Sequence, residues 1–390
     1  VCAVASGSPG PDVHPAVEAA HPSPISASVT RPLRHEAPTS RQTRAVSGGS
    51  SASGTTLADG APAASARRAR VAAHLEQTRV DAVLLTHPVN VAYLTGLVSS
   101  NAACLITSRG ETTLATDSRY AEAVDALDDG LALLTARDVV GALAERAVLA
   151  ASTLAVEQAH LSMSDGQRLT ELLAARATLV DAGPLVEDLR ATKEPAEVDA
   201  VAEACDVSVA ALRQLLAGPF VGRSEREIAR DLEARMLLMG ADGLAFDTIV
   251  ASGPHGSVPH HSPTDRPVAA GDLVTIDCGA KVRGYHADCT RTVLVRSGAR
   301  DWQAELHAVV RQAQADGVAA LSPGASVAMV DAAARDVVTA AGYGEFFVHG
   351  LGHGVGLAIH EPPWLTSTPQ SAGTLPARTT VTVEPGIYLP

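Results

Sequence analysis

The apolar positions along the chain follow either the period of a helix or the short runs of a buried strand, and these patterns predict the elements. Helical spacing of apolar residues covers 67–77, and short apolar runs follow at 82–85, 102–107 and 111–115. The last two runs flank Arg109-Gly110, which predicts a hairpin. Helix and strand patterns then alternate through 120–127, 131–134, 139–149, 154–156, 167–176 and 178–180. We predict a mixed α/β domain over residues 64–190.

A second domain is predicted to begin at residue 191. Pro195 is placed to open a helix, and apolar periodicity continues over 198–216. Longer helical patterns follow at 225–239, 302–321 and 327–340, and strand patterns at 274–278, 286–295 and 380–384. Domains of about 100 to 200 residues are typical, so a chain of this length accommodates two. The second domain extends over 191–390.

The first 63 residues show neither helical nor strand periodicity. They are rich in Ala, Ser, Pro, Gly and Thr and lack the apolar stretch of a signal peptide. We predict a disordered, low-complexity segment at 1–63. Because the first residue is Val, a doubtful start site, a fragment and a biological arm all remain open as explanations.

Composition narrows the class of protein. Hydrophobic residues make up 46% and charged residues 19%, and no apolar run approaches the roughly 20 residues of a membrane helix. The net charge of -13 disfavours a polyphosphate partner, so we expect neither membrane nor nucleic acid binding. The 5 cysteines lack zinc-finger or disulfide spacing, which suits a reducing cytoplasm.

Two aspartates indicate where the chemistry lies. Asp277 interrupts the apolar strand 273–278, and a buried ionised carboxylate needs a partner. A hairpin centred between Val282 and Arg283 would place Asp277 opposite Asp288, both on one face. Like charges that face each other in apolar surroundings favour a cation between them. The alternatives, an exposed hairpin or a salt bridge from Asp288 to Arg291, are equally compatible with this segment alone.

Further candidate ligands lie in two later segments. From His349 to Gly356 glycine occupies every second position, so an extended backbone would present His349 and His353 on one face and let another backbone approach the other. A histidine bracketed by glycines is better explained as a ligand than as a core residue. Glu384 ends the strand 380–384, although a plain strand-terminal glutamate would look the same. Two Asp, one His and one Glu suit a divalent ion.

These segments together resemble the pita-bread metallopeptidases, specifically the aminopeptidase P and Xaa-Pro dipeptidase (prolidase) branch, over about residues 65–390. The resembling segments keep the family's order: Ile276-Asp277-Cys278-Gly279, Gly284-Tyr285-His286-Ala287-Asp288, His349-Gly350-Leu351-Gly352-His353-Gly354, Ile359-His360-Glu361 and Val383-Glu384-Pro385-Gly386. The resemblance implies an α/β N-terminal domain followed by an α+β pita-bread (creatinase/aminopeptidase) catalytic domain.

The resemblance also implies roles for particular residues. Metal ligands would be Asp277, Asp288, His353 and Glu384, with two divalent ions, manganese first and cobalt or zinc as alternatives. His260, His349 and His360 would lie on the substrate side, and His260, His360 and Glu384 would act in catalysis. The substrate would be a peptide with proline at its second position, cleaved before the proline by a hydroxide between two cations, whose coordination lowers the pKa of water to about 7. A cytoplasmic homodimer is the family-level expectation.

One departure from the family keeps rivals open. A second, bridging glutamate follows Glu-Pro-Gly in the family, whereas this sequence ends at Pro390, so we expect a C-terminally truncated fragment that binds its second metal poorly. A non-catalytic pita-bread binding protein and a metal-free creatinase-like amidinohydrolase remain alternatives. The retained carboxylates favour a peptidase over both. Serine hydrolases and P-loop enzymes are disfavoured because their Gly-rich motifs do not occur.

Overall fold

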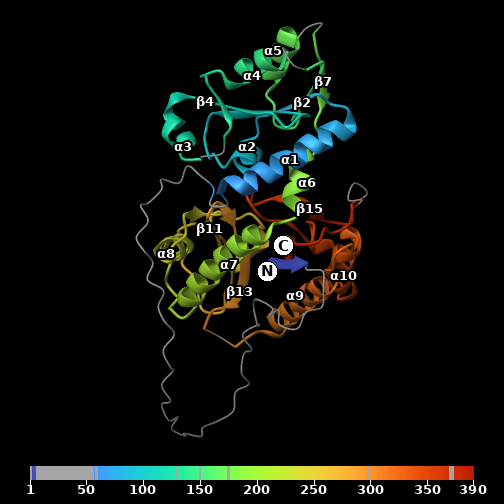
Figure 1. Ribbon diagram of the computed structural model, residues 1–390. Coiled ribbons are helices and arrows are strands. Elements are labelled where there is room, and N and C mark those ends of the chain that lie inside the picture. The colour runs from blue at the N-terminus through green and yellow to red at the C-terminus, as the bar shows by residue number, and fades with distance from the viewer. Residues whose placement is uncertain are drawn as a thin grey trace, which may run out of the picture. The chain divides into compact units, whose positions relative to one another are not determined.

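The computed structural model describes residues 2–5, 57, 60–127, 130–148, 151–173, 176–296, 298–368 and 373–390 (Figure 1). Its first part is built on a six-stranded sheet in the order β5-β4-β3-β2-β6-β7. The strands are β2 (Ala82–Leu85), β3 (Ala102–Thr107), β4 (Thr112–Thr116), β5 (Ala132–Thr135), β6 (Thr153–Val156) and β7 (Thr178–Asp181). β3 and β4 pair antiparallel, as the predicted hairpin requires, whereas β2 and β6 run parallel.

Helices cover both faces of this sheet because its central strands are apolar on both sides. Val83 and Leu85 pack with α1 (Gly60–Thr78) and α2 (Pro88–Thr95), while Ala82 and Leu84 pack with α4 (Val139–Val148) and α5 (Met163–Leu173). Two short helices, α3 (Ala121–Asp125) and α6 (Leu185–Ala191), complete this part. The predicted mixed α/β architecture is confirmed.

The second part places helix pairs against small antiparallel sheets. α7 (Pro195–Leu216) and α8 (Glu225–Leu238) share a core with β9 (Ile249–Ser252) and β10 (Leu273–Cys278). α9 (Asp301–Ala319) and α10 (Val327–Ala340) share another core with residues around β14 (Gly352–Gly354), β15 (Glu361–Leu365) and β16 (Thr379–Thr382). β9, β10 and β13 (Cys289–Leu294) form one sheet, and β8 (Gly243–Leu244), β11 (Ala280–Val282) and β12 (Tyr285–His286) another. The predicted α+β class of this domain is confirmed.

The predicted hairpin register is wrong by two residues. Asp277 pairs with Thr290 and Thr275 with Thr292, so the turn is centred between Arg283 and Gly284. Both turn residues have positive φ, 51° and 84°, the combination of a two-residue type I′ turn. Because the side-chain period of a strand is two, a shift of two residues preserves the face of each side chain. Asp288 lies in the short link before β13 rather than directly opposite Asp277.

Three further differences separate the predicted elements from the observed ones. The sequence pattern missed α2 because every residue from Asn90 to Thr95 is buried, which leaves no polar face to mark a helical period. It also missed α6, a helix of 7 residues. Within the segment predicted to be disordered, β1 (Cys2–Ala5) pairs antiparallel with β16, and α1 begins at Gly60 (Figure 1). Residues 1, 6–56, 58 and 59 of that predicted segment lie outside the described residues.

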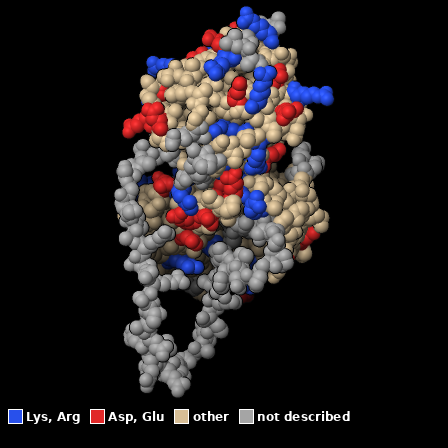
Figure 2. All heavy atoms as spheres, in the orientation of Figure 1, with Lys and Arg blue, Asp and Glu red and all other residues tan. Residues whose placement is uncertain are grey.

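Two observations bear on partners. Among the described residues, no helix is both long and apolar enough to cross a membrane. Acidic and basic side chains are interspersed across the face in Figure 2, so the described part of this face offers no broad basic surface for nucleic acid phosphates.

Candidate metal and peptidase site

Four chain segments carry the candidate ligands, and His353 lies near two of the other three. Asp277 lies near the end of β10, Asp288 just before β13, His353 in the middle of β14, and Glu384 just after β16. β14 lies between β16 and β15, and its glycines allow the neighbouring backbones to come close. A Cβ on Gly352 would collide with the carbonyl of Thr382, and a Cβ on Gly354 would collide with the carbonyl of Pro362. The predicted close approach of another backbone at these glycines is confirmed.

His353 is the centre of this group. Its Nε2 lies 3.3 Å from Oε1 of Glu384 and 3.7 Å from Oδ2 of Asp288. The other ring nitrogen, Nδ1, lies 2.9 Å from the carbonyl oxygen of Gly354, so it donates to that oxygen and leaves Nε2 facing the carboxylates. His353 is 9% and Asp288 8% exposed, so a fully solvent-exposed hairpin is excluded for Asp288.

Electrostatics at the group reflect crowding of carboxylates. Burial and the nearby charge of Glu384 raise the pKa of Asp277, although Thr290 Oγ1 donates to its Oδ1 at 2.8 Å. Burial lowers the pKa of His353, but Glu384 and Asp288 outweigh burial and hold it above the usual value. Negative groups gathered in a largely buried position are stabilised by a cation. Three carboxylates and one imidazole therefore fit divalent metal ions.

The remaining predicted histidines lie around this group. The ring of His360 meets that of His353 edge to face, with centroids 4.4 Å apart, and burial together with His353 lowers the pKa of His360. His260 is exposed and close enough to influence the pKa of both Asp277 and His360. His349 precedes β14, which is shorter than the predicted extended run, and its Nε2 lies 3.3 Å from the hydroxyl of Tyr388.

Comparison with known proteins identifies the family of this chain. The model of metallopeptidase family M24 matches residues 199–390, and the creatinase/prolidase N-terminal domain matches residues 67–192. A Xaa-Pro dipeptidase of Pyrococcus furiosus is 32% identical over 317 residues, 81% of this chain and 88% of that protein. The chain belongs to metallopeptidase family M24.

Solved structures of relatives share the fold of this M24 chain. A Xaa-Pro dipeptidase from Bacillus anthracis has a TM-score of 0.79 at 33% identity, covering 84% of this chain and 91% of its own. An X-Pro aminopeptidase from Thermotoga maritima has a TM-score of 0.75 at 32% identity, covering 83% and 90%. These likenesses confirm the pita-bread fold, and membership of the family identifies a metal-dependent peptidase.

In this M24 chain a buried glutamate that the sequence patterns did not reveal holds the segment carrying His260. Glu225 is fully buried, and its Oε1 accepts from the backbone N–H and hydroxyl of Ser252 and pairs with Nδ1 of His255. Its Oε2 pairs with Nε2 of His261 at 2.9 Å and accepts from Thr264. Glu225 directly follows the N-cap Ser224, where acidic residues are common in any helix. The sequence therefore did not indicate that Glu225 is buried and binds the histidine segment.

A second buried group supports His360. Its neighbour Glu361 is 3% exposed and pairs with Arg190 of α6 and, at 2.6 Å, with Nζ of Lys193. Burial raises the pKa of Glu361, but the two cations outweigh burial and hold it below the usual value. The Leu189–Pro195 segment was predicted only as a domain boundary. The structure adds that its two cations bind the strand next to His360.

Proposed function

We propose that this chain hydrolyses the peptide bond preceding proline in Xaa-Pro peptides. The observation that carries the proposal is the position of His353, whose Nε2 faces both Glu384 and Asp288 with Asp277 close by. Relatives named Xaa-Pro dipeptidase, including one 32% identical, support the substrate class.

Asp277, Asp288, His353 and Glu384 would hold the divalent metal, with manganese the expected ion. Such ions, when bound, polarise a carbonyl and lower the pKa of water to about 7. Glu384 accepts a hydrogen bond from Thr382 Oγ1 at 2.7 Å, which fixes its carboxylate for ligation and for accepting a proton from the attacking water.

The histidines would bind and orient the peptide. A lowered pKa keeps His360 neutral at physiological pH, so it can donate to a substrate carbonyl without carrying a charge. His260, which is exposed, would contact the peptide from solvent, and His349, whose Nε2 lies 3.3 Å from the hydroxyl of Tyr388, would bind it as well. Positioning of this kind contributes as much to rate as the acid and base groups do.

Peptide hydrolysis by the 390-residue chain tests the proposal. The substrates are Xaa-Pro dipeptides, longer Xaa-Pro peptides and matched peptides with alanine in place of proline, each with and without manganese. We expect manganese-dependent cleavage of proline peptides only. Cleavage of dipeptides alone would identify a dipeptidase, and cleavage of longer peptides an aminopeptidase. Absence of hydrolysis with manganese bound would favour a binding protein, and metal-independent amidine hydrolysis a creatinase-like enzyme.

Localisation and assembly are part of the same proposal. The family resemblance supports a cytoplasmic enzyme that forms a homodimer. Light scattering of the purified chain measures the assembly directly, and a mass of one chain, 39.9 kDa, would contradict the dimer.

A further inference from the structure

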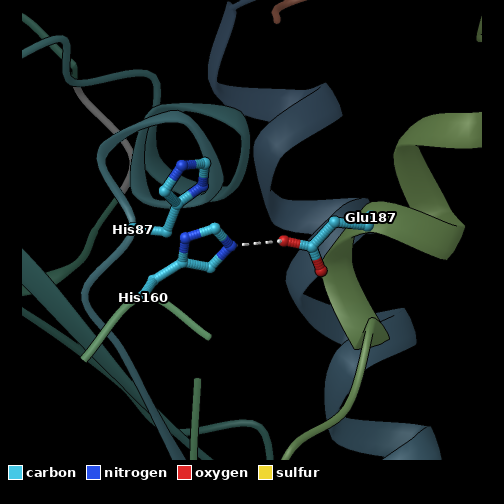
Figure 3. Close-up of side chains that lie close together, drawn as sticks. All are labelled: His87, His160 and Glu187. Carbon is cyan, nitrogen blue, oxygen red and sulfur yellow. Dashed lines mark ion pairs between the residues drawn. The ribbon is translucent and has the colours of Figure 1, made fainter. Parts of the chain in front are cut away.

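A second cluster of metal-binding side chains lies in the N-terminal part of the chain. β2 and β6 are parallel neighbours, and His87 and His160 follow their carboxyl ends. Glu187, on α6, faces the same place (Figure 3). Ligands of open α/β sheets bind outside the carboxyl ends of the strands, so this is the edge at which the fold presents a site.

The donor atoms are close enough to share one ion. One ligand atom from each of the three residues lies within 4.8 Å of the others, and His160 Nε2 is 3.6 Å from Oε1 of Glu187. Bond lengths of roughly 2.0 to 2.2 Å place neighbouring ligands of a tetrahedral zinc ion about 3.3 Å apart. The contact between His160 and Glu187, drawn as a dashed line in Figure 3, is close to that spacing.

The hydrogen bonding of His87 and Glu187 favours binding of a metal ion between them. Nδ1 of His87 is buried without a hydrogen-bond partner, which is a cost that a metal would remove. Burial and the neighbouring His160 lower the pKa of His87, which favours the neutral ring that a metal ion requires. Asn90 Nδ2 donates to Oε1 of Glu187 at 2.6 Å, the kind of contact that orients a ligating carboxylate.

We propose that His87, His160 and Glu187 form a binding site for a zinc-class divalent ion, separate from the candidate peptidase ligands. Two imidazoles and one carboxylate suit zinc, cobalt or nickel better than magnesium or calcium, and water would complete the coordination.

Binding requires one ring to turn. The imidazoles of His87 and His160 stack with centroids 3.8 Å apart and planes 22° from parallel, so both rings cannot point a lone pair at one nearby ion. The side chain of His160 is 35% exposed and lies on a turn, so its ring has open space into which it can turn. The ion thus replaces a stacking contact and the 3.6 Å contact from His160 to Glu187 with coordinate bonds.

Zinc content measures the site directly. The full chain is stripped with a chelator, dialysed against zinc chloride and analysed for zinc per chain by mass spectrometry. The variants are His87→Ala and His160→Ala, and the matched control is His307→Ala, which removes an exposed histidine on α9. We expect the wild type and His307→Ala to hold one zinc more per chain than the other two variants.

Equal zinc content in all four proteins would overturn the proposal. Because the peptidase ligands are unchanged throughout, any zinc they bind cancels in the comparison. His160 is exposed, so His160→Ala is the variant expected to keep its fold, which circular dichroism checks. The measurement counts ions rather than turnover, so its outcome is independent of the proposed peptidase activity.

Discussion

His353 illustrates how one side chain acquires a role from its neighbours. Its ring is held at Nδ1 by the Gly354 carbonyl and approached at Nε2 by Glu384 and Asp288. Burial alone would make this ring hard to protonate, whereas the carboxylates raise its pKa. A residue in this position binds either a proton or a metal ion between itself and the carboxylates.

Glu384→Gln tests that position. The substitution keeps the shape but removes a negative ligand and proton acceptor, so we expect kcat/KM on a Xaa-Pro peptide to fall by about 10²–10⁴ and bound manganese per chain to decrease. Glu345→Gln, at an exposed position, is the control. Wild-type turnover and metal content in Glu384→Gln would show that the carboxylate is not a ligand.

At the scale of elements, Glu225 at the start of α8 fixes the segment between β9 and β10 through hydrogen bonds. His261 points inward to Glu225. His260, in the turn just before it, is exposed, and it influences the pKa of Asp277 and His360. We infer that Glu225 positions His260 without touching the substrate.

Glu225→Gln and His260→Ala, singly and combined, test this inference. The amide of Gln can accept at only one of its two terminal atoms, so several bonds to the segment are lost and the position of His260 relaxes. We expect kcat to fall about 10-fold or more in each single variant, and the double variant to be no slower than His260→Ala. Glu233→Gln, on the same helix, is the control. Additive losses would mean that Glu225 supports only the fold.

At the scale of the whole molecule, one buried ion group ties the helix before the catalytic part to the catalytic strands. Arg190 of α6 donates to Oδ1 of Asn90 at 2.8 Å and also pairs with Glu361 of β15. These side chains are far apart in sequence and almost inaccessible to water. Removing one partner of a buried ion pair leaves the other charge buried and unpaired, so it lowers the free energy of unfolding by more than the intact pair adds to it.

Arg190→Met is accordingly expected to lower the free energy of unfolding by about 3–5 kcal/mol, measured by urea denaturation. Arg226→Met is the matched control, since its pair with Asp265 is exposed and worth about 0–1 kcal/mol. A similar, small effect of both substitutions would contradict the importance of the buried group.

Acid should destabilise the chain through the same kind of group. Burial raises the pKa of Glu225, but hydrogen bonds from His261, Ser252 and Thr264 outweigh it and hold the pKa well below the usual value; the pKa of Glu361 is also lowered. A carboxylate with a lowered folded-state pKa stabilises the fold above its unfolded pKa, about 4.5, and loses that contribution as pH falls through the folded value.

We therefore expect the free energy of unfolding to decline as pH falls below about 4.5, with a shallower decline in Glu225→Gln. Urea denaturation at a series of pH values measures both slopes. Identical slopes in the wild type and Glu225→Gln would show that Glu225 is not held ionised by the fold.

The sequence by itself indicated the longer helices, several strands and the candidate residues. Local patterns suffice where the period of the apolar residues marks the buried side of an element, as it does in α7. The Gly-His-Gly segment around His353 and the aspartates Asp277 and Asp288 were also recognisable in the sequence, because packing in a hydrophobic core does not explain such residues. α2 was missed because it is buried on all sides.

Tertiary structure alone decided what those residues contact. The hairpin register depended on a turn at Arg283-Gly284, whose backbone conformation a pattern of apolar residues does not encode. The links from Glu225 to His261, from Arg190 to Glu361 and from His87 to His160 and Glu187 join positions 30 or more residues apart. Such contacts depend on how whole elements pack, so neighbouring residues in the sequence carry no trace of them.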